Sequence, residues 1–369
     1  MNKKKIYHIH TDFKFLYDSY RFESDMFENQ LVFIGEKNDS NTDYHSSALF
    51  FSGNDNSVDS LIKTLEDADL VVFYALCDKK IKVLEKLPTQ IKTAWRFFGY
   101  ELYGSRHDLM YSKKTIEILY KKKSYYFSLF FGLNFFYKNI RRRIRSAKDL
   151  EYMKKIDFIL LFAEEEYIYL KKHWKVPEFL KLNLDEFLTE DNFSNADNKV
   201  IVGNSRNSFN NHLDIIDLIS NHHSSSEFLF FLNYGSKGRY YLEVMNRIQK
   251  LSNCIVYDEF LGKQEFEQIY STSSAFVLNS HRQMALGNIF LAVKYGLKLY
   301  MNDKNPLKQW LINNNILVSS IEDFEDDLKR EKLSLSLQDK KNNIQSFNNL
   351  YVSYTKTDFC DQVQNILSK

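Results

Sequence analysis

The stretch AFVLNSHRQMALGNIFLAVKYGLKLYMNDKNP, residues 275–306, decides the fold prediction. Its first four residues, 275–278, form an apolar run that is typical of a buried strand. An apolar helix is expected over 289–295, where Gly296 ends it, and a second strand is expected over 297–301. A strand, a loop, a helix and a strand in this order form one crossover of a parallel α/β sheet.

Polar residues and a glycine stand where the first strand ends and the helix begins. His281, Arg282 and Gln283 follow the strand, and Gly287 and Asn288 precede the apolar part of the helix. Ligands bind parallel α/β sheets at the carboxyl ends of the strands. The first N–H groups of a helix, the helix dipole and a nearby guanidinium can together hold a diphosphate. The alternative is an ordinary crossover whose polar loop is only solvated.

The same alternation continues on both sides of this stretch. In the first half, strands are expected at 6–10, 31–34, 48–51, 70–75, 93–98, 157–162 and 179–182, with helices at 15–29, 58–65 and 164–173. In the second half, strands are expected at 200–203, 228–232 and 254–257, with helices at 213–220, 240–251 and 266–270. The polar, aperiodic segment 189–198 is typical of a linker. The sequence therefore predicts two doubly wound α/β domains, residues 1–188 and 199–369, with a ligand cleft between them.

Composition narrows the class of protein. The chain has 369 residues and only three cysteines, which are far apart and have no CxxC spacing. This pattern argues against a disulfide framework or a zinc site and favours a reduced, cytoplasmic protein. No run approaches the ~18 apolar residues of a spanning helix, and the amino terminus lacks the apolar core of a secretory signal.

Residues 113–148 concentrate positive charge beside aromatic side chains. They include eleven Lys and Arg residues and one Glu, although the net charge of the whole chain is only +2. Basic residues flank the run YYFSLFFGLNFFY, 125–137, which is too interrupted to span a bilayer. We expect this segment to lie on an anionic membrane surface. The candidate membrane and acceptor residues are Lys121, Lys122, Lys123, Arg141, Arg142, Arg143 and Arg145.

Two alternatives remain for this segment. The aromatic run can instead form a buried helix pair whose charged rim is solvated. A nucleic-acid site is the other alternative, but its aromatic residues would be expected to alternate with basic ones, and here they are contiguous.

Five stretches of the chain resemble those of one enzyme family. They are WRFFGYELYG (95–104), VIVGNSRNSFNNH (200–212), FLNYGSKGRYYLEVM (231–245), EFLGKQEFEQIYSTSSAFVLNSHRQMALGN (259–288) and LYMNDKNPLKQW (299–310). The family is that of the bacterial TDP-N-acetylfucosamine:lipid II N-acetylfucosaminyltransferases, the 4-alpha-L-fucosyltransferases of glycosyltransferase family 56. The resemblance runs from about residue 6 to about residue 316 and is densest after Val200.

The resemblance implies a GT-B glycosyltransferase, in which two Rossmann-like domains face a cleft. Such an enzyme binds a nucleotide-diphosphate sugar, such as dTDP-N-acetylfucosamine, mostly with its second domain. The family's acceptor is an undecaprenyl-diphosphate-linked glycan at the cytoplasmic face of the bacterial inner membrane. The resemblance further implies that neither a cofactor nor a metal ion is required, and the chain lacks a DxD motif. This sequence departs from the family in WRFFGYE, 95–101, where Phe98 replaces a second Trp and Glu101 replaces an Asp.

Sugar transfer with inversion needs a base for the acceptor hydroxyl and a group that stabilises the leaving diphosphate. Glu101 and Asp12 each follow a predicted strand and are candidates for the base, although either can be a helix cap or a surface carboxylate. The donor-binding candidates from the next two strand ends are Gly203, Asn204, Ser205, Arg206, Tyr234 and Gly235. Tyr240 and Tyr241 are expected to pack rather than bind. A second function class stays open, that of a non-catalytic GT-B-like protein that binds a nucleotide or a lipid-linked glycan.

Overall fold

The computed structural model describes residues 3–35, 48–120, 151–184, 193 and 198–368. They form two compact units. Unit 1 contains the described residues up to Glu101, then 151–184 and 353–368. Unit 2 contains 102–120, 193 and 198–352. Each unit is therefore built from separate parts of the chain, whereas the sequence analysis expected two continuous domains.

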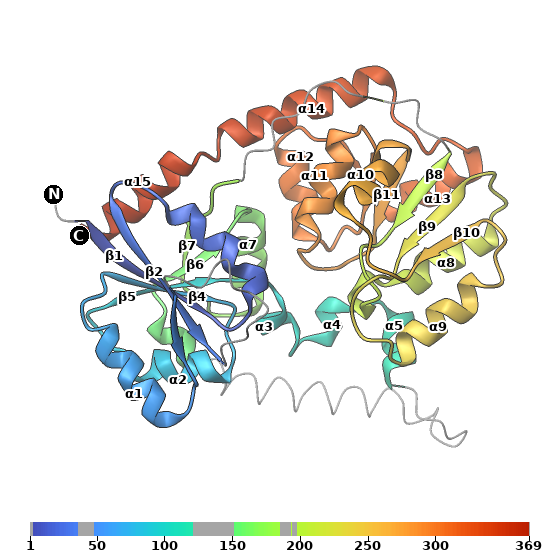
Figure 1. Ribbon diagram of the computed structural model, residues 1–369. Helices are drawn as coiled ribbons and strands as arrows, with labels where there is room; N and C mark the ends of the chain where they lie inside the picture. Colours follow the sequence, from blue (N-terminus) through green and yellow to red (C-terminus); the bar gives the residue numbers. More distant parts are fainter. Residues whose placement is uncertain (1–2, 36–47, 121–150, 185–192, 194–197, 369) are drawn as a thin grey trace. The chain divides into compact units, whose positions relative to one another are not determined.

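Unit 1 has a seven-stranded parallel sheet (Figure 1). In spatial order its strands are β3 (Leu49–Phe51), β2 (Phe27–Ile34), β1 (Lys4–His10), β4 (Leu70–Tyr74), β5 (Lys92–Arg96), β6 (Phe158–Leu161) and β7 (Glu178–Lys181). The helices described for this unit are η1 (Phe13–Phe22), α1 (Asp55–Thr64), α2 (Asp78–Lys86), η4 (Glu151–Lys155), α7 (Glu164–His173) and α15 (Lys356–Leu367). The short α3 (Tyr100–Tyr103) begins in this unit and ends in the other.

Unit 2 has a six-stranded parallel sheet. Its strands are, in spatial order, β10 (Cys254–Tyr257), β9 (Glu227–Phe231), β8 (Lys199–Val202), β11 (Ala275–Leu278), β12 (Lys298–Met301) and β13 (Val318–Ser319). Its helices are α4 (His107–Met110), α5 (Lys113–Tyr120), η5 (Ser208–Asn210), α8 (His212–Asn221), α9 (Arg239–Ile248), α10 (Lys263–Ser271), α11 (Leu286–Lys294), α12 (Pro306–Asn313), α13 (Ile321–Arg330) and α14 (Leu337–Val352).

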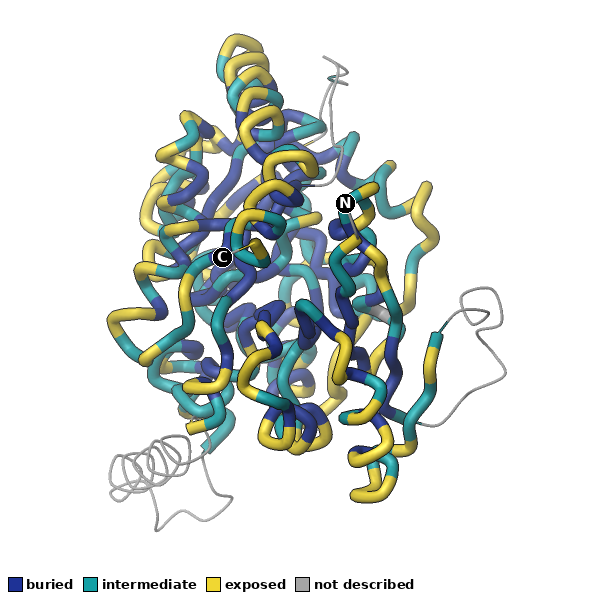
Figure 2. Tube along the Cα trace, turned by 90° about the vertical axis from the view of Figure 1, so that its left-hand side faces the viewer, coloured by how far each residue is buried: buried dark blue, intermediate teal, exposed yellow. Residues whose placement is uncertain are grey.

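The central strands explain why both sheets are parallel and covered. All five residues of β4 (LVVFY) and all four of β11 (AFVL) are buried, as Figure 2 shows for the inner strands. A strand buried on both faces has no polar alternation, because helices cover both sides of the sheet. These runs confirm the predicted doubly wound class. Gly296, at a φ of +69°, follows α11 and ends it as predicted.

The segment that leads into the basic, aromatic run belongs to unit 2. Helix α5 packs against α8 and α9, and its Ile118 and Leu119 lie against the apolar cluster of this unit. Lys114 also pairs with Asp217 of α8 at 2.5 Å. The seven basic residues named above lie outside the described residues. The chain therefore enters this segment from the second unit, whereas the sequence analysis assigned the segment to the first.

One predicted helix is wrong. Residues 15–29 were expected to form a continuous helix, but η1 ends at Phe22 and β2 already begins at Phe27. Strand β2 pairs in parallel with β1, from Lys4 opposite Phe27 to His10 opposite Phe33. The aromatic residues therefore pack from a short helix and a strand rather than along one helical face. Pairing with the neighbouring strand outweighed the local helical pattern.

Candidate functional site

The two sheets share one topology around their centres. In each sheet, the strand that comes first in the sequence lies beside the strand that comes fourth, which places β1 beside β4 and β8 beside β11. The connections that follow the two neighbouring strands therefore lead away to opposite sides. Ligands bind open parallel sheets beyond the carboxyl ends of the strands at such a switch point. The candidate sites are therefore the carboxyl edges of the two sheets, one in each unit.

In unit 2, the loops after β8 and β9 pack closely on two glycines. Gly203 has a φ of +68°, and a Cβ atom there would lie 2.6 Å from His212 Nε2. Gly235 has a φ of +109°, and its Cβ atom would lie 2.6 Å from Asn207 Oδ1. The Arg206 N–H donates to the Tyr234 carbonyl at 3.0 Å, which joins the loops. Both predicted glycines are therefore required by backbone conformation and close approach.

Arg206 binds these loops to a third one. Its guanidinium is buried, donates to the carbonyl oxygens of Leu232 and Asp258, and lies 3.4 Å from an Asp258 carboxylate oxygen. Lys237 also pairs with Asp258, at 2.6 Å. From the sequence, Arg206 was expected to contact a phosphate. The structure shows instead a guanidinium that ties together the ends of β8, β9 and β10, and its contact with a phosphate remains a prediction.

The predicted residues at the end of β9 and in the loop after β8 differ in exposure. Tyr234 is 44% exposed, and Asn204 Nδ2 donates to its hydroxyl at 3.4 Å. Ser205 is buried and accepts hydrogen bonds from Asn207 and Asn210. Tyr234 therefore remains accessible to a ligand, whereas Ser205 stabilises the loop.

The loop between β11 and α11 is buried and carries a neutral imidazole. His281 is 3% exposed, and burial, with Lys304 nearby, lowers its pKa to about 4. The Arg282 guanidinium lies over the Phe209 ring at 4.6 Å and donates to the Gln283 carbonyl at 3.2 Å. Because the histidine is neutral at pH 7, the positive charge of this loop comes from the arginine.

Helix α11 presents its amino terminus at the same edge. The helix begins at Leu286, and its first N–H groups have no partner within the helix. Gly287 is exposed, with open space where a Cβ atom would stand. Asn288 instead directs its amide into the unit and donates to the Tyr270 hydroxyl at 2.8 Å. Of the two predicted residues, Gly287 is therefore accessible to a ligand, whereas Asn288 packs inside the unit.

A chain of asparagine amides connects the strand ends. Asn211, in the left-handed conformation at the start of α8, accepts from the Ser112 N–H at 2.8 Å and donates to the Asn279 carbonyl at 3.0 Å. Asn279 donates to the Asn211 carbonyl at 3.2 Å and accepts from Asn302 at 2.7 Å. The segment 102–120 is thereby bonded to the loops after β8, β11 and β12.

Buried polar atoms without partners gather at this edge. They come from the loops after β8, β9, β11 and β12, and within the described part of the chain they have no hydrogen bond: Asn210 Oδ1, His212 Nε2, Asn233 Oδ1, His281 Nδ1 and Asn305 Nδ2. Such atoms are rare in folded proteins, because each costs the free energy of a lost hydrogen bond. Two further buried atoms of this kind, His10 Nδ1 and Asn183 Oδ1, lie at the carboxyl edge of unit 1, and at either edge a ligand or ordered water would supply the missing partners.

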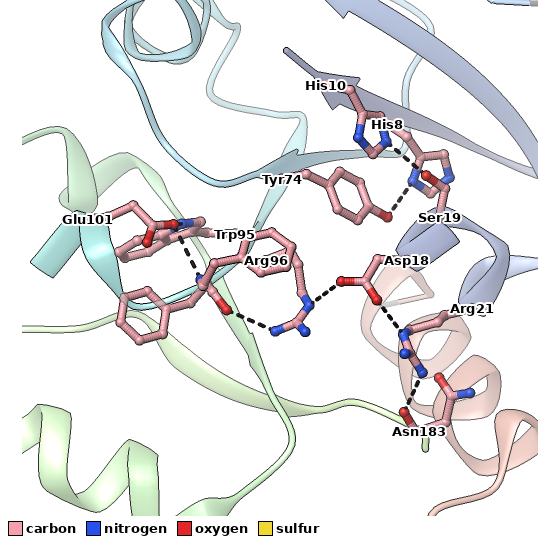
Figure 3. A network of polar contacts seen from close by, with 12 residues as sticks. His8, His10, Asp18, Ser19, Arg21, Tyr74, Trp95, Arg96, Glu101 and Asn183 are labelled. Carbon is pink, nitrogen blue, oxygen red and sulfur yellow. Dashed lines mark hydrogen bonds and ion pairs between the residues drawn. The ribbon is translucent and has the colours of Figure 1, made fainter. Parts of the chain in front are cut away.

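At the carboxyl edge of unit 1, buried charges are paired with one another (Figure 3). Asp18 accepts from Arg21 at 3.0 Å and from Arg96 at 2.8 Å, and both arginines are buried. These guanidiniums hold the pKa of the Asp18 carboxyl below its usual value, although burial of the carboxylate opposes them. Arg21 also donates to the Asn183 carbonyl at 2.7 Å. This network fixes the loops after β1, β5 and β7.

The two predicted bases lie at this edge and differ in their contacts. The Oε1 atom of Glu101 accepts from the Trp95 indole at 3.3 Å and from the Phe98 N–H at 3.4 Å, as expected of a capping carboxylate (Figure 3). Asp12 follows β1, an inner strand that lies beside β4 at the switch point, and is exposed. Of the two predicted bases, only Asp12 is therefore exposed at the end of an inner strand.

Two buried histidines of β1 also face this edge. His8 Nδ1 lies 3.0 Å from the Tyr74 hydroxyl, and His10 Nε2 lies 2.8 Å from the Ser19 hydroxyl (Figure 3). Burial lowers the pKa of His8 to about 4 and that of His10 to about 2, so both rings are neutral at pH 7. Neither was predicted, because a histidine inside an apolar run has no spacing that distinguishes it from a core residue.

The chain resembles known proteins in its fold rather than in its sequence. No protein-family profile matches the sequence, and no curated protein sequence matches it either. Several solved structures match over nearly their whole length. A glycosyltransferase from Rickettsia africae matches with a TM-score of 0.64 at 11% identity, covering 100% of this chain and 98% of that chain.

Two further matches are equally complete. A sucrose-phosphate synthase from Thermosynechococcus elongatus has a TM-score of 0.63 at 10% identity, over 99% of this chain and 98% of that chain. HepE from Anabaena, in complex with UDP and glucose, has a TM-score of 0.60 at 10% identity, over 99% of each chain. This chain has the GT-B fold. The two parallel sheets, with seven and six strands, agree with it.

The described residues lack a membrane-spanning helix and a metal-binding cluster. No helix there is both long and apolar enough to cross a membrane. Within the same residues, no group of three or more His, Cys, Asp or Glu side chains is arranged to hold a metal ion.

Sequence reasoning missed two residues that the GT-B fold brings to its sheet edges. Lys80, in α2, is buried at the switch point of unit 1. Its signal was available, because Lys80, Val83 and Leu84 share the buried face of one helix. Asn211 had no comparable signal, since its partners Ser112 and Asn279 are 99 and 68 residues away in the sequence.

Proposed function

We propose that this chain is a glycosyltransferase that takes a sugar from a nucleotide-diphosphate donor. The observation that carries this proposal is the group of buried, partnerless polar atoms at the carboxyl edge of unit 2. They surround the switch point at which doubly wound sheets bind nucleotides. The GT-B fold supports the proposal, and so does the structural match to HepE, which is in complex with UDP and glucose.

The donor diphosphate binds at the amino terminus of α11 in this proposal. Its oxygens accept hydrogen bonds from the first N–H groups of the helix, where Gly287 leaves the backbone accessible. Arg282 precedes the helix and supplies positive charge. Tyr234 is exposed at the end of β9, where its ring can stack on the nucleotide base.

The reaction exchanges one bond at the anomeric carbon of the donor sugar. The bond from this carbon to the diphosphate oxygen breaks, and its electron pair leaves with the nucleoside diphosphate. The acceptor hydroxyl oxygen forms the new glycosidic bond, and its proton passes to a carboxylate of unit 1. Asp12 is the better candidate for that base, because it is exposed at the end of β1, whereas Glu101 is only partly exposed.

The donor, acceptor and location are proposed from the family resemblance. We propose a dTDP-linked 6-deoxy-acetamido sugar such as N-acetylfucosamine, and an undecaprenyl-diphosphate-linked glycan as acceptor. Transfer takes place without a metal ion at the cytoplasmic face of the bacterial inner membrane, where the basic segment 121–145 binds anionic lipid. The product is a precursor of a surface polysaccharide of the enterobacterial-common-antigen type.

A panel of nucleotides and nucleotide sugars tests the proposal. Saturation-transfer NMR should show one nucleoside diphosphate bound in preference to the others. Incubation with the matching nucleotide sugar and a polyprenyl-diphosphate glycan should add one sugar mass in the mass spectrum. Binding of no nucleotide at all would refute the proposed function.

The basic segment is tested separately. Exchanging Arg141, Arg142, Arg143 and Arg145 for Ser should release the protein from anionic vesicles and slow transfer to the polyprenyl acceptor. Transfer to a short, water-soluble acceptor should be nearly unchanged, because the segment does not take part in the chemistry. Equal losses on both acceptors would instead assign these arginines to the fold or the active site.

A second candidate function is a GT-B-like protein that binds a nucleotide or a lipid-linked glycan without transferring a sugar. One observation favours it: the carboxylate of Glu101 is engaged by Trp95 and Phe98, as in a purely structural cap. Selective nucleotide binding without any transfer, in the panel above, would identify this function.

A further inference from the structure

Asn211 occupies an unusual backbone position at the carboxyl edge of unit 2. It lies between η5 and α8 with a φ of +49° and a ψ of +42°, in the left-handed region, and it is 0% exposed. This conformation costs free energy in residues other than glycine, although asparagine adopts it more often than most. Such residues concentrate at functional sites, where the surrounding contacts hold them in place.

The Asn211 side chain joins two segments that are far apart in the sequence. Its Oδ1 atom accepts the Ser112 N–H at 2.8 Å, at the residue that precedes α5. Its Nδ2 atom donates to the Asn279 carbonyl at 3.0 Å, and the Asn279 side chain donates to the Asn211 carbonyl at 3.2 Å. Neither segment can therefore shift without breaking a buried hydrogen bond, which is costly.

Asn279 begins the loop that leads to α11, and residues next to Asn211 hold this loop at a second point. The Phe209 ring, two residues before Asn211, lies 4.6 Å from the Arg282 guanidinium. Between the two contacts, the Ser280 hydroxyl donates to the Arg282 carbonyl at 3.0 Å. Arg282 and the amino terminus of α11 form the proposed diphosphate site, so this part of the chain sets the position of that site.

Helix α5 docks on unit 2 through apolar and charged contacts. Ile118 lies against the apolar cluster of the unit, and Lys114 pairs with Asp217 of α8 at 2.5 Å. Docking of the helix fixes the Ser112 N–H that Asn211 accepts. The contacts of α5 therefore reach the diphosphate loop through one buried side chain.

We propose that Asn211 is a positioning residue that couples the docking of α5 to the geometry of the diphosphate-binding loop, so that each favours the other. This inference rests on the proposed function and deepens it. Coupling between two parts of a protein is reciprocal, so a donor bound at the loop also stabilises α5 on the unit. In the sequence, α5 leads into the basic, aromatic segment that we propose binds the membrane. Attachment of that segment should therefore strengthen donor binding.

The variant Asn211→Gly removes the joint and keeps the backbone conformation, since glycine adopts a positive φ freely. Titration with dTDP should show an affinity about 5- to 20-fold lower than that of the wild type. Amide hydrogen exchange should become faster both around Ser112 and in the loop 280–285. Faster exchange in only one of these segments, or an unchanged dTDP affinity, would overturn the inference.

Two isoleucines of one apolar cluster separate coupling from a general loss of stability. Ile118 of α5 and Ile321 of α13 are both partly buried against this cluster. Both Ile118→Ala and Ile321→Ala should lower the melting temperature, but only Ile118→Ala should lower the dTDP affinity, by about three- to fivefold. In the Asn211→Gly background, Ile118→Ala should have no further effect on affinity. Equal effects of the two alanine variants, or additive effects with Asn211→Gly, would make Asn211 a structural support only.

An exchange measurement without nucleotide separates this inference from the proposed function. With no ligand present, the amides of 280–285 should exchange faster in Ile118→Ala than in Ile321→Ala. If no nucleotide binds, the proposed function fails, while this difference still supports the coupling. The absence of the difference would refute the coupling whether or not a nucleotide binds.

Discussion

The carboxyl edges of the two sheets have the same topology but different chemistry. In unit 1 the edge carries buried charges: Asp18 with its two arginines, and the ammonium of Lys80. In unit 2 the edge carries an amide chain from Asn211 to Asn302 and neutral imidazoles. The buried charges of this edge are mainly arginines, Arg206 and Arg282, and the Asp258 carboxylate is paired with Arg206 and Lys237. One topology therefore supports two kinds of site, because the loops and not the strands carry the chemistry.

The difference fits two different tasks. A site for a diphosphate needs N–H donors, a helix amino terminus and positive charge, and carboxylates would repel the ligand. A site that removes a proton from a hydroxyl needs a carboxylate whose charge state is controlled. Unit 2 has the first set of groups, and unit 1 has an exposed carboxylate, Asp12, at the end of β1. The following predictions test this division, beginning with the largest expected effect.

Acidification should weaken both units together. His8 and His10 in unit 1, and His212 and His281 in unit 2, have pKa values lowered by burial to about 4, 2, 3 and 4. The unfolded chain binds protons near pH 6.5, whereas the folded chain keeps these rings neutral, so stability is present above pH 6.5 and is lost as the pH falls toward 4. At pH 5 each ring should cost about 2 kcal/mol.

Urea unfolding at pH 7.5 and pH 5 measures this effect. Replacing one histidine of each unit, for example His10→Gln and His281→Gln, should make the fall in stability shallower. If both variants lose stability with pH as steeply as the wild type, buried neutral histidines are not the cause.

Replacing two glycines of unit 2 should give opposite results. Gly203→Ala adds a methyl group 2.6 Å from His212 Nε2 at a φ of +68°, and should cost about 2–4 kcal/mol. Gly287→Ala adds its methyl group in open space within a helix, and should add up to about 1 kcal/mol. That methyl group stands where we propose that the diphosphate binds, so donor affinity should fall although the fold is more stable. Urea unfolding and nucleotide titration of the same samples separate the two effects.

Alanine variants of the two buried arginines of the donor edge should differ more in melting temperature than in donor KM. Arg206→Ala and Arg282→Ala should each raise the donor KM by roughly 10- to 100-fold, since a charge-assisted contact to phosphate is lost. Arg206→Ala should also lower the melting temperature, because its guanidinium ties the ends of β8, β9 and β10 together. Arg239→Ala, at an exposed position, serves as the control. An unchanged donor KM in both variants would remove this edge from the donor site.

Metal removal should have the smallest effect. If the helix amino terminus and the arginines neutralise the leaving diphosphate, transfer in EDTA should equal transfer in magnesium. Loss of activity in EDTA that magnesium or manganese restores would contradict the proposed division of tasks.

The sequence by itself determined the class of fold. Buried runs such as 70–75 and 275–278, separated by helices of ordinary length, are typical of covered parallel sheets, because their residues are apolar on both faces. It also determined that Gly203 and Gly235 lie in strand-end loops and that Tyr240 and Tyr241 pack in the core, which the structure confirms. Such features depend on residues that are close together in the sequence, so sequence patterns predict them.

Only the tertiary structure decided which residues share an edge. Arg206 meets Asp258, and Asn211 meets both Ser112 and Asn279, through contacts that strand order creates. It also placed 102–120 in unit 2 and 353–368 in unit 1, against the predicted boundaries. Glu101 looked like a base because it follows a strand, yet its partners are an indole and a backbone N–H. The physical reason is that a side chain's charge and hydrogen bonds depend on distances in space, and strand pairing sets these distances between residues far apart in the sequence.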